Sequence, residues 1–95
     1  MNWDNQSNFV GYIGERLRNI PVILEQKNSF FNPTTNSNTY FYQFKKDNDR
    51  LIWWTSVRIP HQINTPIVIS GTVKDHITYK GEDKTVLTRV KVEER

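Results

Sequence analysis

Residues 66–93 read PIVISGTVKDHITYKGEDKTVLTRVKVE. Two runs rich in β-branched residues flank a short segment that contains Gly81, a pattern typical of a β-hairpin. Cationic side chains recur along both runs. The stretch therefore predicts a long hairpin that belongs to a small β-barrel with a basic surface.

The alternation of side chains along this hairpin divides it into two faces. With Gly81 and Glu82 at the centre of the turn, Tyr79 faces Lys84 and Val73 faces Val90. The set predicted to point inward is Ile67, Ile69, Gly71, Val73, Ile77, Val86, Val90 and Val92. The set predicted to point outward is Lys74, His76, Thr78, Thr85, Leu87, Arg89 and Lys91.

Three further strands are predicted before the hairpin. They are Val22–Phe31, which follows Pro21, then Thr39–Lys45 and Arg50–Arg58. Turn-forming residues at Lys46–Asp49 join the last two strands. The connector Ile59–Pro66 is bracketed by prolines and is too short for a substantial helix.

Two segments lack a clear strand pattern. Residues 9–20 carry apolar side chains near helical spacing, but Gly11 and Gly14 each cost a helix about 1 kcal/mol. A short turn or one-turn cap over the end of the barrel is therefore expected there. Asn32–Asn38 has the composition of a mobile loop.

Composition restricts the class of protein. At 95 residues the chain is one domain, expected to comprise a flexible segment at 1–8 and a folded unit at 9–95. It has no cysteine, which excludes disulfides and thiolate metal sites. No apolar run approaches the ~20 residues that span a membrane, and the N-terminus lacks signal-peptide features, so a cytoplasmic location is expected.

Five strands in about 90 residues favour an all-β, five-stranded OB-like barrel. An SH3-like barrel is the second choice, and a small sandwich is the third. The net charge of +3 is compatible with nucleic-acid binding and equally with ordinary solubility.

Three segments carry a resemblance to a known group of proteins. They are Arg50–Ser56, Ile69–His76 and Tyr79–Arg89, and Gly11–Leu17 fits the same pattern. Together they resemble small OB-like replication accessory proteins of phages and mobile genetic elements, including the polymerase partners of staphylococcal cassette chromosome elements. The resemblance implies DNA replication as the context and a DNA polymerase or primase, encoded nearby, as the partner.

The second and third predicted strands offer the best binding surface. With Asn48 and Asp49 as the turn, the more apolar face is Tyr40, Tyr42, Phe44, Leu51, Trp53, Thr55 and Val57. The opposite face combines aromatic and cationic side chains: Phe41, Lys45, Trp54 and Arg58. Single-stranded DNA binding needs this combination, because bases stack on rings and cations meet phosphates. Packing of Phe41 and Trp54 under another segment, or their use in a protein interface, remains open.

Lys74, Arg89 and Lys91 form a second candidate surface, a cationic stripe on the last hairpin. Such a stripe is either a solvated face or a set of phosphate contacts. The Asn32–Asn38 loop either closes over a bound strand or has no role in binding.

The sequence argues against catalysis. His61 and His76 lack ligands at metal-binding spacing, and Gly11 and Gly14 are not followed by the rest of a P-loop. No carboxylate pair suited to acid–base chemistry is evident. We therefore expect a protein without cofactor, metal or small-molecule substrate that supports primer synthesis by binding a polymerase or primase, single-stranded DNA, or both. The alternative is a protein-only binding module, such as a phage-type inhibitor of a host enzyme.

Overall fold

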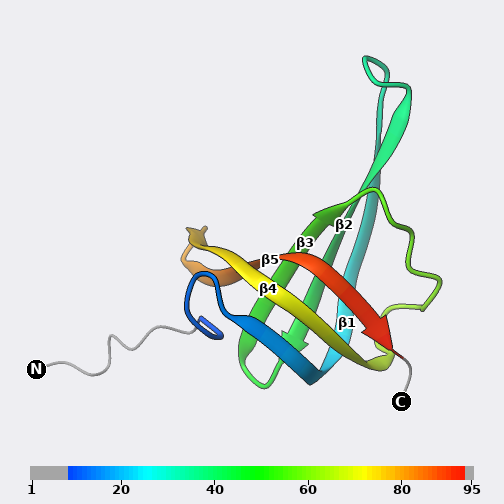
Figure 1. The fold of residues 1–95 in the computed structure, drawn as a ribbon. Coiled ribbons are helices and arrows are strands. Elements are labelled where there is room, and N and C mark those ends of the chain that lie inside the picture. The colour runs from blue at the N-terminus through cyan, green and yellow to red at the C-terminus, as the bar shows by residue number, and fades with distance from the viewer. Residues whose placement is uncertain (1–8, 94–95) are drawn as a thin grey trace, which may run out of the picture.

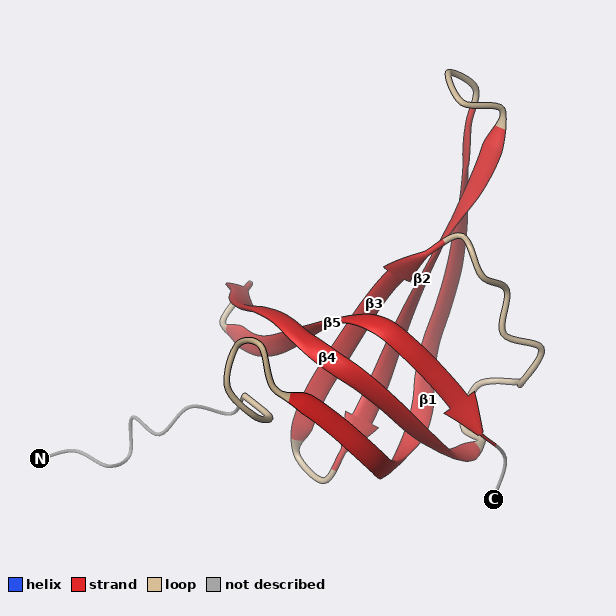
Figure 2. Ribbon diagram, in the orientation of Figure 1, coloured by secondary structure: helices blue, strands red, loops and turns tan. Residues whose placement is uncertain are grey.

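The computed structural model describes residues 9–93, and all regular structure in this range is β-strand (Figures 1 and 2). The strands are β1 (Arg16–Asn32), β2 (Ser37–Lys46), β3 (Asp49–Thr55), β4 (Pro66–Tyr79) and β5 (Glu82–Glu93). The prediction of an all-β chain with five strands is confirmed. The predicted flexible segment at 1–8 lies outside the described residues.

The five strands close into a barrel in the order β1-β2-β3-β5-β4. β1 pairs antiparallel with both β2 and β4, whereas β3 and β5 are parallel neighbours. After the β1-β2-β3 meander the chain returns to place β4 beside β1, which is a Greek-key path. A closed five-stranded barrel of this kind is OB-like, so the predicted fold class is confirmed.

The described N-terminal segment forms a turn and then enters the barrel. The backbone N–H of Glu15 donates to the carbonyl of Tyr12 at 2.9 Å, which closes the turn. Residues 16–20 instead belong to β1 and pair with β4. The prediction that all of residues 9–20 form a turn or cap is therefore wrong for this part.

A β-bulge accounts for the misleading apolar spacing in that segment. Between Leu17 and Ile20, β1 contains one more residue than β4 does. Asn19 supplies the left-handed conformation, with φ of 52°. The extra residue brings Leu17 and Ile20 to the same core side, so a strand imitates the spacing of a helix. Pro21 follows the bulge, a position in a strand where proline is tolerated.

The β2–β3 hairpin turns at Asp47 and Asn48, one residue earlier than predicted. The facing pairs therefore differ from the prediction by two residues, and Phe41 faces Trp54. A shift of two leaves the side chains within β2 and β3 on their predicted faces, because the side-chain period of a strand is two. Tyr42 is accordingly buried in the core, as predicted. Val57, predicted on the apolar face, lies beyond the end of β3 and is exposed.

The β4–β5 hairpin departs further from its predicted pairing. It turns at residues 80–81, and Val73 faces Leu87 rather than Val90. Thr85 and Leu87, predicted to point outward, are buried, whereas Val86 is not in the core cluster. Two bulges cause the change, because each reverses the alternation beyond it.

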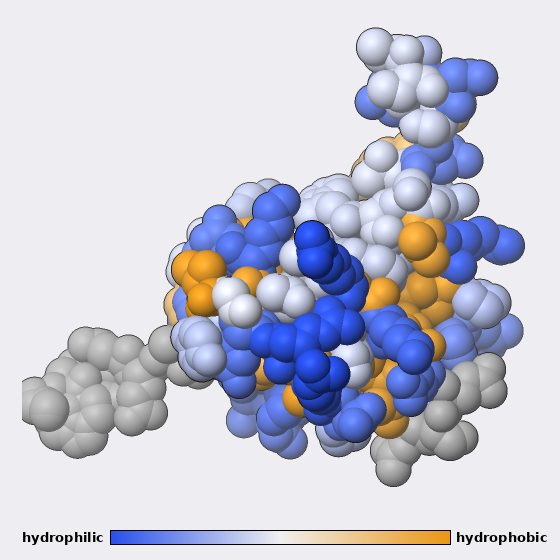
Figure 3. Space-filling view, in the orientation of Figure 1, coloured by the Kyte–Doolittle hydropathy of each residue, from blue (hydrophilic) through white to orange (hydrophobic). Residues whose placement is uncertain are grey.

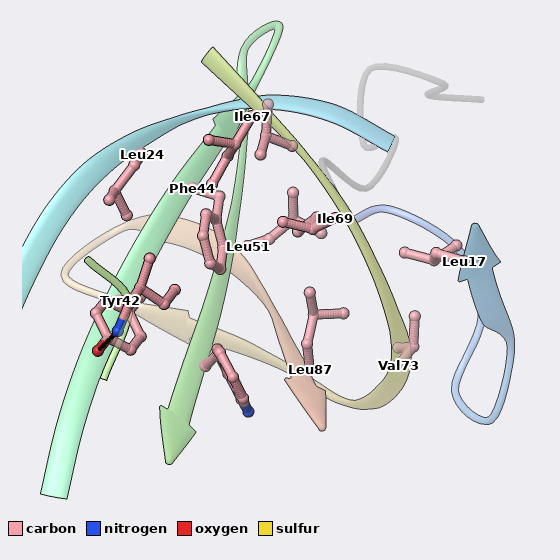
Figure 4. Packing of buried hydrophobic residues seen from close by; sticks show 12 residues of the cluster. Leu17, Leu24, Tyr42, Phe44, Leu51, Ile67, Ile69, Val73 and Leu87 are labelled. Carbon is pink, nitrogen blue, oxygen red and sulfur yellow. Dashed lines mark hydrogen bonds between the residues drawn. The ribbon is translucent and has the colours of Figure 1, made fainter. Parts of the chain in front are cut away.

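The barrel interior is a single apolar cluster with members from all five strands and the β3–β4 connector (Figure 4). Its buried members are Leu17, Val22, Leu24, Tyr42, Phe44, Leu51, Trp53, Ile59, Ile67, Ile69, Val73 and Leu87. Gly71 lets β4 approach β5 closely, since a Cβ there would lie 3.1 Å from Cγ2 of Val90. This packed interior leaves the outer surfaces of the strands available for binding.

The far ends of β1 and β2 project from the barrel as a two-stranded arm (Figure 1). The predicted loop Asn32–Asn38 is reduced to a turn at residues 33–36, because the flanking residues continue the strands. The side-chain oxygen of Asn32 accepts from the Thr34 amide at 2.9 Å and stabilises this turn. The arm is therefore an ordered hairpin rather than a long loop.

Candidate nucleic-acid interface

Phe41 and Trp54 form an aromatic pair on the outer surface of the barrel. They lie directly opposite each other on β2 and β3, and their ring centroids are 4.5 Å apart. Trp54 is 53% exposed, so it is not packed under another segment, whereas Phe41 is half-buried. The prediction that the two rings share one outer face is supported by this pairing.

Phe30, on β1, extends the pair to three rings. Its ring centroid is 6.0 Å from that of Trp54, and the residue is 50% exposed. Phe30 faces Thr39 on β2, which is two residues from Phe41 and hence on the same face. We call Phe30, Phe41 and Trp54 the aromatic triad. Sequence reasoning missed Phe30 because the pairing of β1 with β2 was needed to give it a face.

A polar network lies beside the triad on the same outer surface. The Gln43 amide donates to Oε1 of Glu25 and accepts from Nζ of Lys84, each at 2.8 Å. Nε of Arg50 lies 2.9 Å from the same Glu25 oxygen. The network joins β1, β2, β3 and β5, and it neutralises one of the cations nearest to the rings.

Lys45 lies on the aromatic side of β2, opposite Arg50. It is four residues from Phe41, which corresponds to about 13 Å along a strand. Within residues 9–93 its ammonium has no carboxylate partner. Phe41, Lys45 and Trp54 therefore lie on one surface. Together with Phe30 they form what we call the aromatic face.

Arg58 does not join the aromatic face. β3 ends at Thr55, so Arg58 belongs to the connector and its predicted place on a strand is wrong. It lines a cavity of ≈ 220 Å³ together with Lys27, Tyr40 and Tyr42. Tyr40 and Tyr42 alternate with Phe41 along β2, so Arg58 lies on the reverse side from the triad.

Tyr42 fastens the connector beneath this cavity. Its hydroxyl donates to the Val57 carbonyl at 2.9 Å and accepts from the Ile59 amide at 2.8 Å. Burial raises the pKa of the Tyr42 hydroxyl above its usual value, and the Ile59 hydrogen bond partly offsets this. The role of Tyr42 is therefore structural.

Lys74, Arg89 and Lys91 lie on β4 and β5, away from the aromatic triad. β5 pairs with β3 as far as Leu87, and beyond that residue it pairs with β4 alone. These cations therefore do not complete the aromatic face. They are exposed on a second surface, which the β4 and β5 strands carry in front of β2 and β3 in Figure 1.

Neither histidine has two further metal-ligating side chains grouped with it in the part of the chain that the structure describes. No group of three metal-ligating side chains occurs among residues 9–93. The His76 ring instead stacks on Phe9 at 4.3 Å, and its Nε2 lies 3.0 Å from the Gly11 carbonyl oxygen. His76 therefore helps to fasten the N-terminal segment to the barrel.

No protein-family model, curated protein or solved structure matches this chain. The resemblance to replication accessory proteins therefore remains a prediction based on sequence segments. Across residues 9–93 there is no helix of the length and apolarity that crossing a membrane requires.

Proposed function

We propose that this chain is a non-catalytic, cytoplasmic accessory protein of DNA replication in a mobile genetic element. It binds single-stranded DNA on the aromatic face and brings it to a DNA polymerase or primase. The observation that carries the DNA-binding part is the aromatic triad on the outer sheet of an OB-like barrel. In OB-folds the face of strands two and three is the common site for oligonucleotides.

The three rings suit stacking with unpaired bases. Each stacked base contributes about 1–3 kcal/mol as measured by alanine substitution, and every base has a π-face. Binding of this kind is tolerant of sequence. A template-holding accessory needs such tolerance because it meets many sequences during replication.

The charge on the aromatic face is modest. Lys45 is unpaired among the described cations, whereas Arg50 is paired with Glu25 and Lys84 lies 3.8 Å from Glu82. Few phosphate contacts give weak affinity and a shallow salt dependence. Weak binding agrees with a protein that acts beside a polymerase rather than alone.

The same observation favours a second candidate function, a protein-only binding module. An exposed tryptophan beside compensated charges is typical of a protein-interface hot spot. A phage-type inhibitor of a host enzyme has these features too. Both candidates use the aromatic face and differ in the ligand that covers it.

A titration with single-stranded DNA distinguishes them. Trp54→Ala is expected to weaken binding of a fluorescein-labelled oligothymidine by roughly 5- to 150-fold, the loss of one stacked base. The measurement is fluorescence anisotropy at low salt. Tyr79→Ala is the matched control, because Tyr79 is 58% exposed but lies at the far end of β4.

Equal binding by the wild type and Trp54→Ala would overturn the aromatic-face proposal. No binding by the wild type at low salt would favour the protein-only module. Capture of the neighbouring polymerase or primase by the wild type, lost in Trp54→Ala, would then identify the triad as the contact with that enzyme.

A further inference from the structure

Four cationic side chains flank the middle of β4 on the surface away from the aromatic triad. Arg16 and Arg18 lie on β1, and Arg89 and Lys91 lie on β5. β1 and β5 are the two neighbours of β4 in the barrel, so these pairs are about 10 Å apart across it. We call this surface the basic face. The most hydrophilic residues in Figure 3 gather where β1, β4 and β5 face the viewer.

Both strands that flank β4 contain a β-bulge beside these cations. β1 has its bulge at Arg18 and Asn19, and β5 has a bulge around Arg89, both opposite residues 69–72 of β4. Arg89 adopts φ of 54°, which is uncommon for a residue other than glycine. Bulges redirect side chains, and backbone strain of this kind is found most often at functional sites.

Arg16 is held in place before any ligand arrives. Its Nη1 donates to the Arg89 carbonyl at 2.7 Å and to Oγ1 of Thr72 at 3.2 Å. The guanidinium retains further N–H donors, since it carries five. Arg16 is therefore both a brace between β1 and β5 and a donor to an anion on the surface.

The positive charge of the basic face is largely uncompensated. Lys91 has one carboxylate near it, Glu93 at 3.9 Å. Within residues 9–93, Arg16, Arg18 and Arg89 have no ion-pair partner. Positive charges that lack partners repel one another, and an anionic ligand reduces that repulsion.

The side chains between the cations indicate which anion fits. Thr72 is the partly exposed residue of β4 here; its hydroxyl accepts from Arg16 and still has its own O–H to donate to a phosphate oxygen. Ser70 is buried, and its hydroxyl accepts from the Asn19 amide. Neither offers a ring for an unpaired base. In duplex DNA the bases are already stacked and the phosphates are outside, so backbone contacts alone are sufficient.

We propose that the basic face binds the phosphodiester backbone of duplex DNA through Arg16, Arg18, Arg89 and Lys91, without regard to sequence. The proposal rests on the proposed function in one respect, the choice of DNA as the polymer. With unpaired template on the aromatic face and duplex on the basic face, the protein binds a junction between single-stranded and double-stranded DNA. A growing primer creates such a junction.

The test uses the full chain and a labelled random-sequence duplex of about 20 base pairs, with binding followed over a salt series. The variant Arg18→Gln/Arg89→Asn/Lys91→Gln leaves the hydrogen-bonded Arg16 intact, and Asn tolerates positive φ. The control Lys46→Gln/Arg58→Gln/Lys80→Gln removes the same charge elsewhere. We expect a slope of log affinity against log salt of about −3.6 for the wild type and control, from four contacts. The triple variant on the basic face is expected near −0.9, from one contact.

Equal losses in the variant and the control would overturn the proposal, because net charge alone would then explain binding. Competition by polyglutamate as effective as that by duplex, at equal charge, would overturn the assignment to DNA. Failure of the aromatic-face proposal is a separate outcome. It leaves Trp54→Ala with normal single-strand binding and does not alter the duplex slopes.

Discussion

The aromatic face and the basic face differ in the kinds of side chain that they expose. The aromatic face has three clustered rings and charges that are mostly paired, including Arg50 with Glu25. The basic face has arginines that lack ion-pair partners among residues 9–93, with the Thr72 hydroxyl between them. Base stacking and attraction to phosphate both contribute to nucleic-acid affinity, and here the side chains suited to each lie on different surfaces of one barrel.

β1 connects the two faces. Its first part pairs with β4 and carries Arg16 and Arg18, and its far part pairs with β2 and carries Phe30. A small barrel thus presents two surfaces without a second domain. We expect the faces to act independently, because charges separated by more than about 10 Å in physiological salt are screened from each other.

Salt should separate the two binding modes most strongly. Between roughly 50 and 200 mM salt, four duplex contacts predict a loss of affinity of about 10²-fold. Single-strand binding through one or two phosphate contacts predicts a loss of less than about 10-fold over the same range. Anisotropy titrations of the wild type with both ligands measure this contrast, and parallel salt curves would show that one surface binds both.

The difference between the faces also explains what the sequence could predict. The β2–β3 hairpin has continuous pairing, so a turn predicted one residue too late shifted the facing pairs by two residues and left Phe41 and Trp54 on the correct face. Hydrophobic alternation was therefore sufficient to locate the aromatic pair. Phe30 required knowledge of how the distant β1 pairs with β2.

The basic face lies where β-bulges interrupt the regular alternation of side chains along the strands. Bulges at Asn19 in β1 and near Arg89 in β5 each insert a residue. The second lies between Thr88 and Lys91, so alternation continued along β5 from Val92 assigned Leu87 to the wrong side. Arg16 and Arg18 were missed because a bulged strand carried apolar residues at helical spacing. A bulge is stabilised by pairing with strands remote in sequence, which a reading of short segments does not include.

Tyr42→Phe tests whether the barrel beneath the aromatic face can be weakened without changing either binding mode. The substitution leaves the Val57 carbonyl and the buried Ile59 amide without their partner. We expect the free energy of unfolding to fall by about 1–3 kcal/mol, measured by denaturant titration. Affinity for single-stranded and duplex DNA should be unchanged while the protein is folded.

The pH dependence provides a second readout of the same substitution. The Tyr42 pKa is raised in the folded protein, so above the unfolded value of 10.0 the unfolded chain binds fewer protons and stability falls as pH rises. The contribution of Tyr42 is therefore complete below pH 10 and is lost through the higher folded pKa. Tyr42→Phe should flatten this alkaline decline. A decline unaltered by Tyr42→Phe would contradict the burial of the Tyr42 hydroxyl as its cause.

The smallest expected effect comes from removing one carboxylate from each face in turn. Glu25→Gln keeps an oxygen acceptor for Gln43 and Arg50 but removes the charge that compensates Arg50. Single-strand affinity should rise about two- to threefold, within the range of about 0.2–1 kcal/mol for partly exposed ion pairs. The salt slope should steepen by about 0.7, and duplex binding should not change.

Glu93→Gln is the reciprocal change, because Glu93 accompanies Lys91 on the basic face. It should strengthen duplex binding to a similar extent and leave single-strand binding unchanged. The two variants carry the same net charge, so a difference between them reports position alone. Equal gains on both ligands from either variant would mean that surface charge acts over the whole barrel and that the two faces are not separate sites.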